Sequence, residues 1–185
     1  HTNPTEIDMA VTSFGQRVQI TPIQLATAYC SIANGGKLMK PRIVKEITDS
    51  NGIVVKSYES QVVRQVISES TSKELMNMLE QVVASGTGSN AYVSGYRVAG
   101  KTGTAEVAPY KTSWHSWMVA YAPYDAPPKD QVVIATIVEA CNPWEWWAPY
   151  ATNIVIQGIF GKQTYEEAIK ELGFTYLMKN RNRQE

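Results

Sequence analysis

The sequence has few cysteines, no net charge and no long apolar run, and each absence excludes a class of protein. Two cysteines, Cys30 and Cys141, are too few for a disulfide framework. Seventeen basic and seventeen acidic side chains cancel, so no overall field favours nucleic acid or an acidic membrane surface. No apolar run approaches the roughly 18 residues of a membrane-spanning helix. With 185 residues, 44% of them hydrophobic, we expect one globular domain or a large piece of one.

Histidine is also scarce, which bears on metal binding. The two histidines, His1 and His115, lie far apart and have no ligand-type spacing around them. We therefore expect no metal and no cofactor, and a solvent-facing or locally hydrogen-bonded imidazole at His115. The chain begins with His1 instead of methionine. We take it as a fragment, which leaves open that the protein meets a membrane only through an N-terminal anchor absent from this chain.

Helix and turn signals organise the first half of the chain. Thr21, Pro22 and Gln24 form a capping pattern that predicts a helix ending near Asn34. Asn51-Gly52, between segments rich in branched residues, predicts an exposed hairpin over about 43–58. Thr71 and Glu74 form a second capping pattern, which predicts a helix ending near Ser85-Gly86. Its apolar stripe comprises Leu75, Met78, Leu79, Val82 and Val83.

The second half reads as an antiparallel meander followed by helices. Three strands are expected, over about Tyr96–Glu106, Ser116–Ala122 and Gln131–Glu139. A helix over about Tyr150–Phe160 is expected to carry Ile154, Val155 and Ile159 to the sheet, and a shorter helix covers Tyr165–Leu172. The polar tail over about 176–185 is expected to fray. The predicted fold class is α+β, with an antiparallel sheet of three strands from this chain and packing helices.

The segment VAGKTGTAE, Val98 to Glu106, changes from apolar to small and polar around one lysine. Glycines let another molecule lie against the backbone. A cation, small hydroxyls and an open strand edge suit a peptide with a free carboxylate. The alternative interpretation is an edge strand whose lysine discourages aggregation.

Five segments in order carry a wider resemblance. They are SFGQ at 13–16, TPIQLATAY at 21–29, IANGGKLMKPRIV at 32–44, VVASGTG at 82–88 and GYRVAGKTGTAE at 95–106. Over residues 13 to about 160, the chain resembles the C-terminal part of the transpeptidase domain of class B penicillin-binding proteins, of the elongation or sporulation type in Gram-positive bacteria. Lys-Thr-Gly is the third motif of that fold. The resemblance implies that 1–185 is the C-terminal portion of one such domain.

The resemblance also implies an activity. The family's serine attacks the D-Ala-D-Ala carbonyl of a peptidoglycan stem peptide on the outer face of the cytoplasmic membrane, and β-lactams mimic this donor. Lys101 then supplies positive charge, the hydroxyls of Thr102 and Thr104 bind the donor carboxylate, and Gly103 leaves room for the substrate. The backbone N–H of Thr104 is one of two oxyanion-hole donors. Two alternatives share the fold: a β-lactam sensor or scaffolding protein without turnover, and a serine β-lactamase.

The nucleophile is expected outside this chain. Ser70 and Lys73 match Ser-x-x-Lys, but they open an amphipathic helix with a surface-type cap, so we reject them. No Ser-x-Asn occurs in the sequence. The resemblance places both motifs upstream of His1, so the missing N-terminal part of the domain is an expected partner. Arg17 departs from the glycine usual after SFGQ, which puts a positive φ angle there in doubt.

Two polar or aromatic features near the motif have competing interpretations. Glu106 ends the motif strand and fits a surface carboxylate better than a substrate contact. The segment CNPWEWWAPY, Cys141 to Tyr150, places Trp144, Trp146 and Trp147 in a predicted loop. The tryptophans either cover the neighbouring helix and hairpin or line the rim of the substrate cleft, where Glu145 could meet the acceptor amine.

Overall fold

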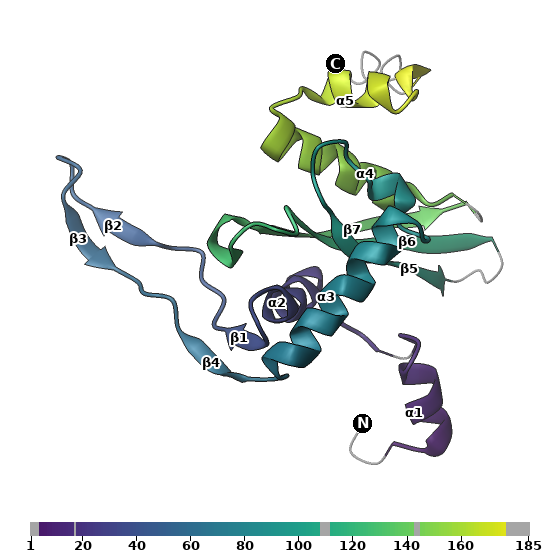
Figure 1. The fold of residues 1–185 in the computed structure, drawn as a ribbon, viewed down its shortest axis with the longest axis horizontal. Helices are drawn as coiled ribbons and strands as arrows, with labels where there is room; N and C mark the ends of the chain where they lie inside the picture. Colours follow the sequence, from purple (N-terminus) through teal and green to yellow (C-terminus); the bar gives the residue numbers. More distant parts are fainter. Residues whose placement is uncertain (1–3, 17, 108–111, 143–144, 177–185) are drawn as a thin grey trace.

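A three-stranded antiparallel sheet forms the centre of the computed structural model, which describes residues 4–16, 18–107, 112–142 and 145–176 (Figure 1). The strands β5 (Ala99–Val107), β6 (Ser113–Ala122) and β7 (Val132–Cys141) are hydrogen-bonded in the order β5-β6-β7. This confirms the predicted meander and the α+β class. Among the described strands β5 pairs only with β6, so its other side is a sheet edge.

The two faces of this sheet pack against different helices. Directly opposed residues of an antiparallel pair share a face, and the faces alternate along each strand. On one face the Thr136 hydroxyl bonds the Thr152 hydroxyl of α4 (Trp147–Ile156) at 2.9 Å. On the other face Ala99 pairs with Tyr121, and both lie in a buried cluster with Ala33 of α2 (Pro22–Ala33). The sheet is therefore covered on both sides (Figure 1).

The capping predictions for the first long helices had opposite outcomes. The Thr21 hydroxyl accepts a hydrogen bond from the Gln24 backbone N–H, and the Gln24 side chain accepts one from the Thr21 N–H, which confirms the start of α2. The predicted Thr71–Glu74 cap is wrong. Ser68 caps α3 (Glu69–Ala84), because its hydroxyl accepts from the Thr71 N–H at 3.1 Å and satisfies one of the free amides of the first turn.

The apolar stripe predicted for α3 is correct only in part. Leu79 and Val83 are buried and belong to the clusters on the two faces of the sheet. Met78 is 63% exposed, and Met76 packs against the core instead. The helix packs against β5 and α2, and Met78 lies on the side of α3 turned away from them.

The helix after the sheet begins earlier than predicted. It starts at Trp147, with Pro149 in its first turn, where no intrahelical N–H donor is needed and proline is tolerated. Ile156 is fully buried, whereas Val155 and Ile159 are exposed, so their predicted contact with the sheet is wrong. A π-helical segment, η3 (Gln157–Gly161), follows. The next helix, α5 (Tyr165–Glu171), confirms the predicted Tyr165–Leu172 helix, with Leu172 as its C-cap.

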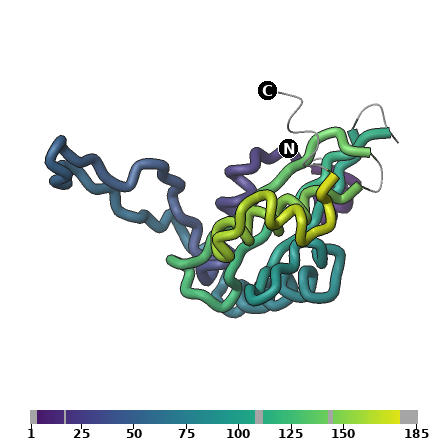
Figure 2. The backbone as a smooth tube through the Cα atoms, turned by 90° about the horizontal axis from the view of Figure 1, so that it is seen from above, coloured from purple at the N-terminus to yellow at the C-terminus, as the bar shows by residue number. Residues whose placement is uncertain are grey.

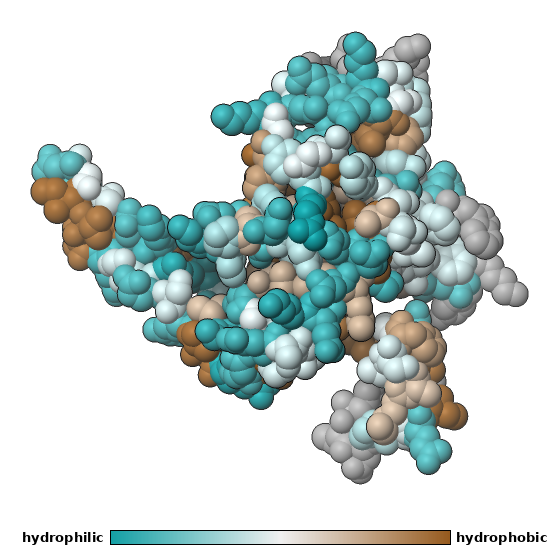
Figure 3. Space-filling model, in the orientation of Figure 1, coloured by the Kyte–Doolittle hydropathy of each residue, from teal (hydrophilic) through white to brown (hydrophobic). Residues whose placement is uncertain are grey.

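An antiparallel arm projects from the body of the molecule (Figure 2). At its base β1 (Lys37–Met39) pairs with β4 (Val62–Gln65), and further out β2 (Glu46–Thr48) pairs with β3 (Val54–Ser57) around the predicted Asn51-Gly52 turn. Several apolar side chains on the arm are exposed (Figure 3), among them Ile43, Ile53, Val54, Val55 and Val63.

Short elements complete the described chain. They are α1 (Glu6–Thr12), η1 (Ser89–Ala91) and η2 (Pro128–Asp130). Within the ranges described above, none of the helices combines the length and apolarity that crossing a membrane requires. Arg17 and almost all of the predicted 176–185 tail lie outside the described residues.

Gly100, the first glycine of the motif strand, serves packing and not ligand approach. A Cβ at this position would lie 2.5 Å from the Val119 carbonyl oxygen and 2.7 Å from Met118 Cε. The space beside Gly100 is filled by the protein itself, so the interpretation of this glycine as an opening for another molecule is wrong. At Gly103 a Cβ would meet Trp117 Cβ at 3.3 Å, a tight contact but a longer one than those at Gly100.

We expect Gly100→Ala to destabilise the protein by about 1–3 kcal/mol, the usual cost of overpacking a core, because backbone atoms of β6 cannot move aside. Gly103→Ala is the matched control and should cost less, since its nearest contact is longer, 3.3 Å against 2.5 Å. Urea unfolding of the full-length protein measures both. Equal free energies of unfolding for the two variants would contradict this account.

Candidate active site

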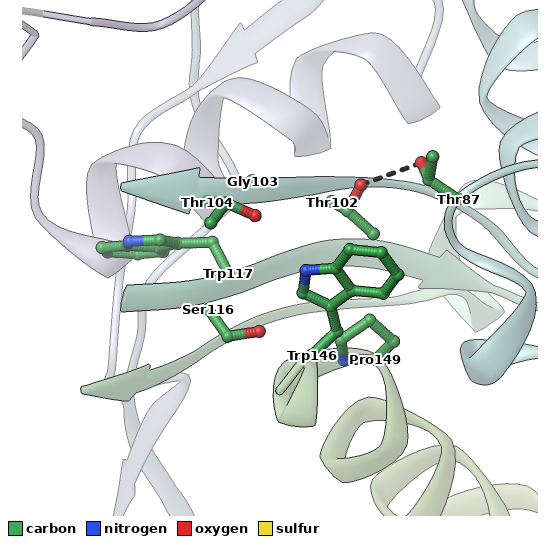
Figure 4. A pocket seen from close by; sticks show the side chains of 8 residues that line it. All are labelled: Thr87, Thr102, Gly103, Thr104, Ser116, Trp117, Trp146 and Pro149. Carbon is green, nitrogen blue, oxygen red and sulfur yellow. Dashed lines mark hydrogen bonds between the residues drawn. The ribbon is translucent and has the colours of Figure 1, made fainter. Parts of the chain in front are cut away.

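A small cavity lies on the face of the sheet that carries α4, beside the edge strand β5 (Figure 4). Its volume is about 110 Å³. Strands β5 and β6, the turn after α3 and the start of α4 all contribute to it. The lining residues are Thr87, Thr102, Gly103, Thr104, Ser116, Trp117, Trp146 and Pro149.

Three of the four predicted site residues line this cavity. Thr102 and Thr104 are two positions apart on β5, so their side chains share the face that carries α4. Thr102 is half-buried and Thr104 is exposed. Gly103 lies between them, and its missing side chain leaves space for Trp117 on the opposite face. Two adjacent hydroxyls on a free strand edge can donate to one carboxylate while the backbone pairs with an extended peptide.

Lys101, the fourth predicted residue, is not among the residues that line the cavity. Because strand faces alternate, its side chain leaves β5 on the face opposite to that of Thr102. The residue is exposed, and its ammonium donates a hydrogen bond to the Thr102 carbonyl at 2.9 Å. The cation therefore lies close to the strand backbone, near the hydroxyl pair but not in the same cavity.

A glycine-flanked turn brings Thr87 to the strand. The Thr87 and Thr102 hydroxyl oxygens are 3.0 Å apart, a hydrogen bond between residues 15 positions apart in the chain. Gly86 and Gly88 let this turn press against the end of α3, since a Cβ would lie 2.9 Å from the Val82 carbonyl oxygen at Gly86 and 3.2 Å from it at Gly88. Nothing local in the sequence motif VVASGTG indicates this contact.

Ser116 was missed by sequence reasoning because it looks like any strand residue. It is paired with Thr104 across the strands and is 2% exposed. Its hydroxyl accepts a hydrogen bond from the Ala148 backbone N–H at 3.2 Å, which satisfies one free amide in the first turn of α4. This bond fixes the start of α4, and with it Pro149, against the cavity.

The adjacent tryptophans have different roles. Trp146 is 51% exposed and its indole lies along the cavity (Figure 4). Trp147 packs against Tyr150 and Phe174, with ring centroids 6.2 and 5.5 Å away. Its indole N–H donates to Glu145 at 3.0 Å, and this bond and one from Asn142 lower the pKa of that carboxyl. Trp144 lies outside the described residues.

The rejected Ser-x-x-Lys motif lies outside this cavity. Ser70 and Lys73 are exposed at the start of α3 and line a separate hollow of about 450 Å³, formed by the first turns of α3 and by Gly35. The Ser70 hydroxyl is hydrogen-bonded to the Ser68 hydroxyl at 2.8 Å, and the intervening Ser72 is buried with its hydroxyl on the Ile32 carbonyl. These contacts belong to the helix cap and to the packing of α3 on α2.

The remaining polar candidates have local roles. His115 Nδ1 accepts a hydrogen bond from the Ala140 N–H at 3.1 Å, which confirms the locally bonded imidazole. Glu106 is exposed at the far end of β5 and does not line the cavity. Over the described part of the chain, no group of three or more histidine, cysteine or acidic residues is placed to hold a metal ion.

Comparisons with known proteins point to one family. Residues 1–154 match the family model described as the penicillin binding protein transpeptidase domain. "Stage V sporulation protein D" of Bacillus subtilis is 50% identical over 101 residues, covering 54% of this chain and 16% of that protein. "Penicillin-binding protein 2A" of Bacillus subtilis is 35% identical over 155 residues, covering 76% of this chain and 20% of that protein. The chain thus spans about a fifth or less of these relatives.

Solved structures are similar over most of the chain. The transpeptidase domain of penicillin-binding protein 3 from Burkholderia pseudomallei superimposes with a TM-score of 0.71 at 29% identity, covering 87% of this chain and 48% of that one. Penicillin-binding protein A from M. tuberculosis, solved as an imipenem acyl-enzyme complex, gives a TM-score of 0.69 at 28% identity, covering 84% of this chain and 35% of that one.

Proposed function

The chain belongs to the penicillin-binding protein transpeptidase family, and from this premise we propose that its full-length protein is a class B peptidoglycan D,D-transpeptidase. Residues 1–185 are then the C-terminal portion of one transpeptidase domain, with the arm over about 43–58 as an extension. The observation that carries the proposal is the pair of Thr102 and Thr104 hydroxyls beside a cavity on the free edge of β5.

The reaction is an acyl transfer in two steps. A serine oxygen bonds to the D-Ala-D-Ala carbonyl carbon of a stem peptide, the C–N bond to the terminal D-alanine breaks, and the leaving nitrogen takes a proton. An amine of a neighbouring strand then attacks the ester, and the serine oxygen is released with a proton. We assign this serine, its lysine and the Ser-x-Asn to the part of the domain that precedes this chain.

The residues of this chain bind and orient the donor. The donor lies along the edge of β5, with its carboxylate at the hydroxyls of Thr102 and Thr104. Lys101, which is hydrogen-bonded to the strand backbone, supplies positive charge toward the carboxylate and the serine. The Thr104 N–H is one oxyanion-hole donor, and such a donor is typically worth ~3 kcal/mol of transition-state stabilisation. A β-lactam occupies the same place as the donor.

The setting of this reaction is the outer face of the bacterial cell membrane, where the proposed peptidoglycan substrate lies. We propose an N-terminal anchor for the full-length protein. The partners in this proposal are the stem peptide, β-lactams and the N-terminal part of the same domain.

Intact-mass measurement after incubation with a fluorescent penicillin tests the proposal. We expect one covalent adduct on the full-length protein, with the peptide that carries it lying outside residues 1–185. The isolated chain is expected to form none. A stoichiometric adduct mapped to Ser70 would overturn the assignment of the nucleophile, and a full-length protein that forms no adduct would overturn the function. Rapid hydrolysis of the penicillin would instead indicate a β-lactamase.

A further inference from the structure

The turn Gly86-Thr87-Gly88 contributes a polar contact to the cavity. The acyl-transfer scheme gives this contact no role. Thr87 lies outside the Lys-Thr-Gly motif, yet its hydroxyl is 3.0 Å from that of Thr102. Thr87 is exposed, so burial alone does not explain its position. The close approach of the glycines to Val82 holds the turn in place.

The proton arrangement of the two hydroxyls has a functional consequence. A hydroxyl has one proton to donate and two lone pairs that accept. If Thr102 donates to a carboxylate, its proton is committed there, and the bond between the two threonines then requires Thr87 to be the donor. Hydrogen bonds in such a chain polarise one another, so a Thr87 donor strengthens the donation from Thr102.

We propose that Thr87 is a positioning residue that orients the Thr102 hydroxyl as a donor toward the carboxylate of the donor peptide or β-lactam. Without Thr87, the Thr102 hydroxyl is free to rotate, and part of its population points its proton away from the ligand. The motif VVASGTG then has a specificity role: it favours ligands with a free carboxylate over ligands without one. This inference rests on the proposed acyl-transfer function.

The test compares benzylpenicillin with its methyl ester, which lacks the carboxylate, by second-order acylation rates of the full-length protein. Thr87→Val removes the hydroxyl and keeps the shape. We expect it to lower the preference for the free acid over the ester about threefold to tenfold, the usual range for one hydrogen bond. Thr87→Ser should retain the wild-type preference. Thr48→Val, an exposed threonine on β2 in the arm, is the matched control and should change nothing.

A double-mutant cycle with Thr102→Val separates positioning from general packing. In the Thr102→Val background, Thr87→Val should have no further effect on the preference, because the hydroxyl that it orients is gone. Additive effects, or equal loss of rate with both ligands, would overturn the inference. The two proposals fail differently: a wild-type protein that reacts with neither ligand refutes the proposed function, whereas a reactive protein with an unchanged Thr87→Val preference refutes only the role of Thr87.

Discussion

Lys101→Ala in the full-length protein is expected to slow acylation by penicillin at least tenfold while leaving its melting temperature unchanged. The side chain is exposed, and its hydrogen bond goes to the neighbouring Thr102 carbonyl, so its removal disturbs little packing. A hydrogen bond to a charged group typically contributes about 1.5–3 kcal/mol, which corresponds to a rate loss of at least about tenfold. The second-order rate constant for acylation by a fluorescent penicillin measures the effect.

Two control variants separate the effect of the charge of Lys101 from the effect of its position. Lys101→Arg keeps the positive charge and should recover part of the rate. Lys56→Ala removes an exposed lysine from the arm and should leave acylation unchanged. If Lys101→Ala is acylated as fast as the wild type, the lysine serves only as a protective charge on an edge strand.

Substitutions of Trp146 and Trp147 are expected to have different effects, although the two residues are adjacent in the chain. Loss of Trp146 should affect activity, and loss of Trp147 should affect stability. Trp146→Ala should lower transpeptidation of long glycan substrates about threefold to tenfold, as expected for aromatic contacts of about 0.5–1.5 kcal/mol. Its effect on melting temperature should be small, because the indole is 51% exposed along the cavity. Acylation by a small penicillin should change less than transpeptidation does.

Trp147→Ala provides the matched control. Its ring packs against Tyr150 and Phe174 and its N–H bonds Glu145, so we expect a loss of about 3 kcal/mol in the free energy of unfolding. That value is the lower end for an aromatic core residue, since Trp147 is half-buried. Thermal unfolding and substrate assays on both variants decide the matter. A loss of stability in Trp146→Ala equal to that in Trp147→Ala would show that both rings serve packing.

Features with local causes were predictable from the sequence. The start of α2 follows from Thr21 and Gln24, which satisfy each other's backbone amides within one turn. The arm follows from Asn51-Gly52, because that turn takes a positive φ angle at Gly52. The order of β5, β6 and β7 follows from short connections between consecutive strands. The Lys-Thr-Gly segment, which carries the candidate site, was likewise visible in the sequence, because its residues are contiguous.

Where the sequence offers more than one possible helix start, tertiary packing determines which one is used. Ser68 and Thr71 are both residue types that cap helices, and α3 begins at the earlier one. Ser72 is then inside the helix, buried, with its hydroxyl on the Ile32 carbonyl. Pro149 looked like a loop residue, yet the Ser116 hydroxyl satisfies the neighbouring amide of α4 and lets the helix begin before it.

The sequence by itself therefore determined the fold class, the family and the strand that carries the candidate site. The tertiary structure alone decided which side chains meet there. Thr87 reaches Thr102 and Ser116 reaches Ala148 across 15 and 32 positions of the chain. Such contacts depend on how helices pack on a sheet, and no periodicity or capping pattern encodes them. For the same reason, only packing separates the exposed Trp146 from the packed Trp147 and assigns the space beside Gly100 to Val119 and Met118.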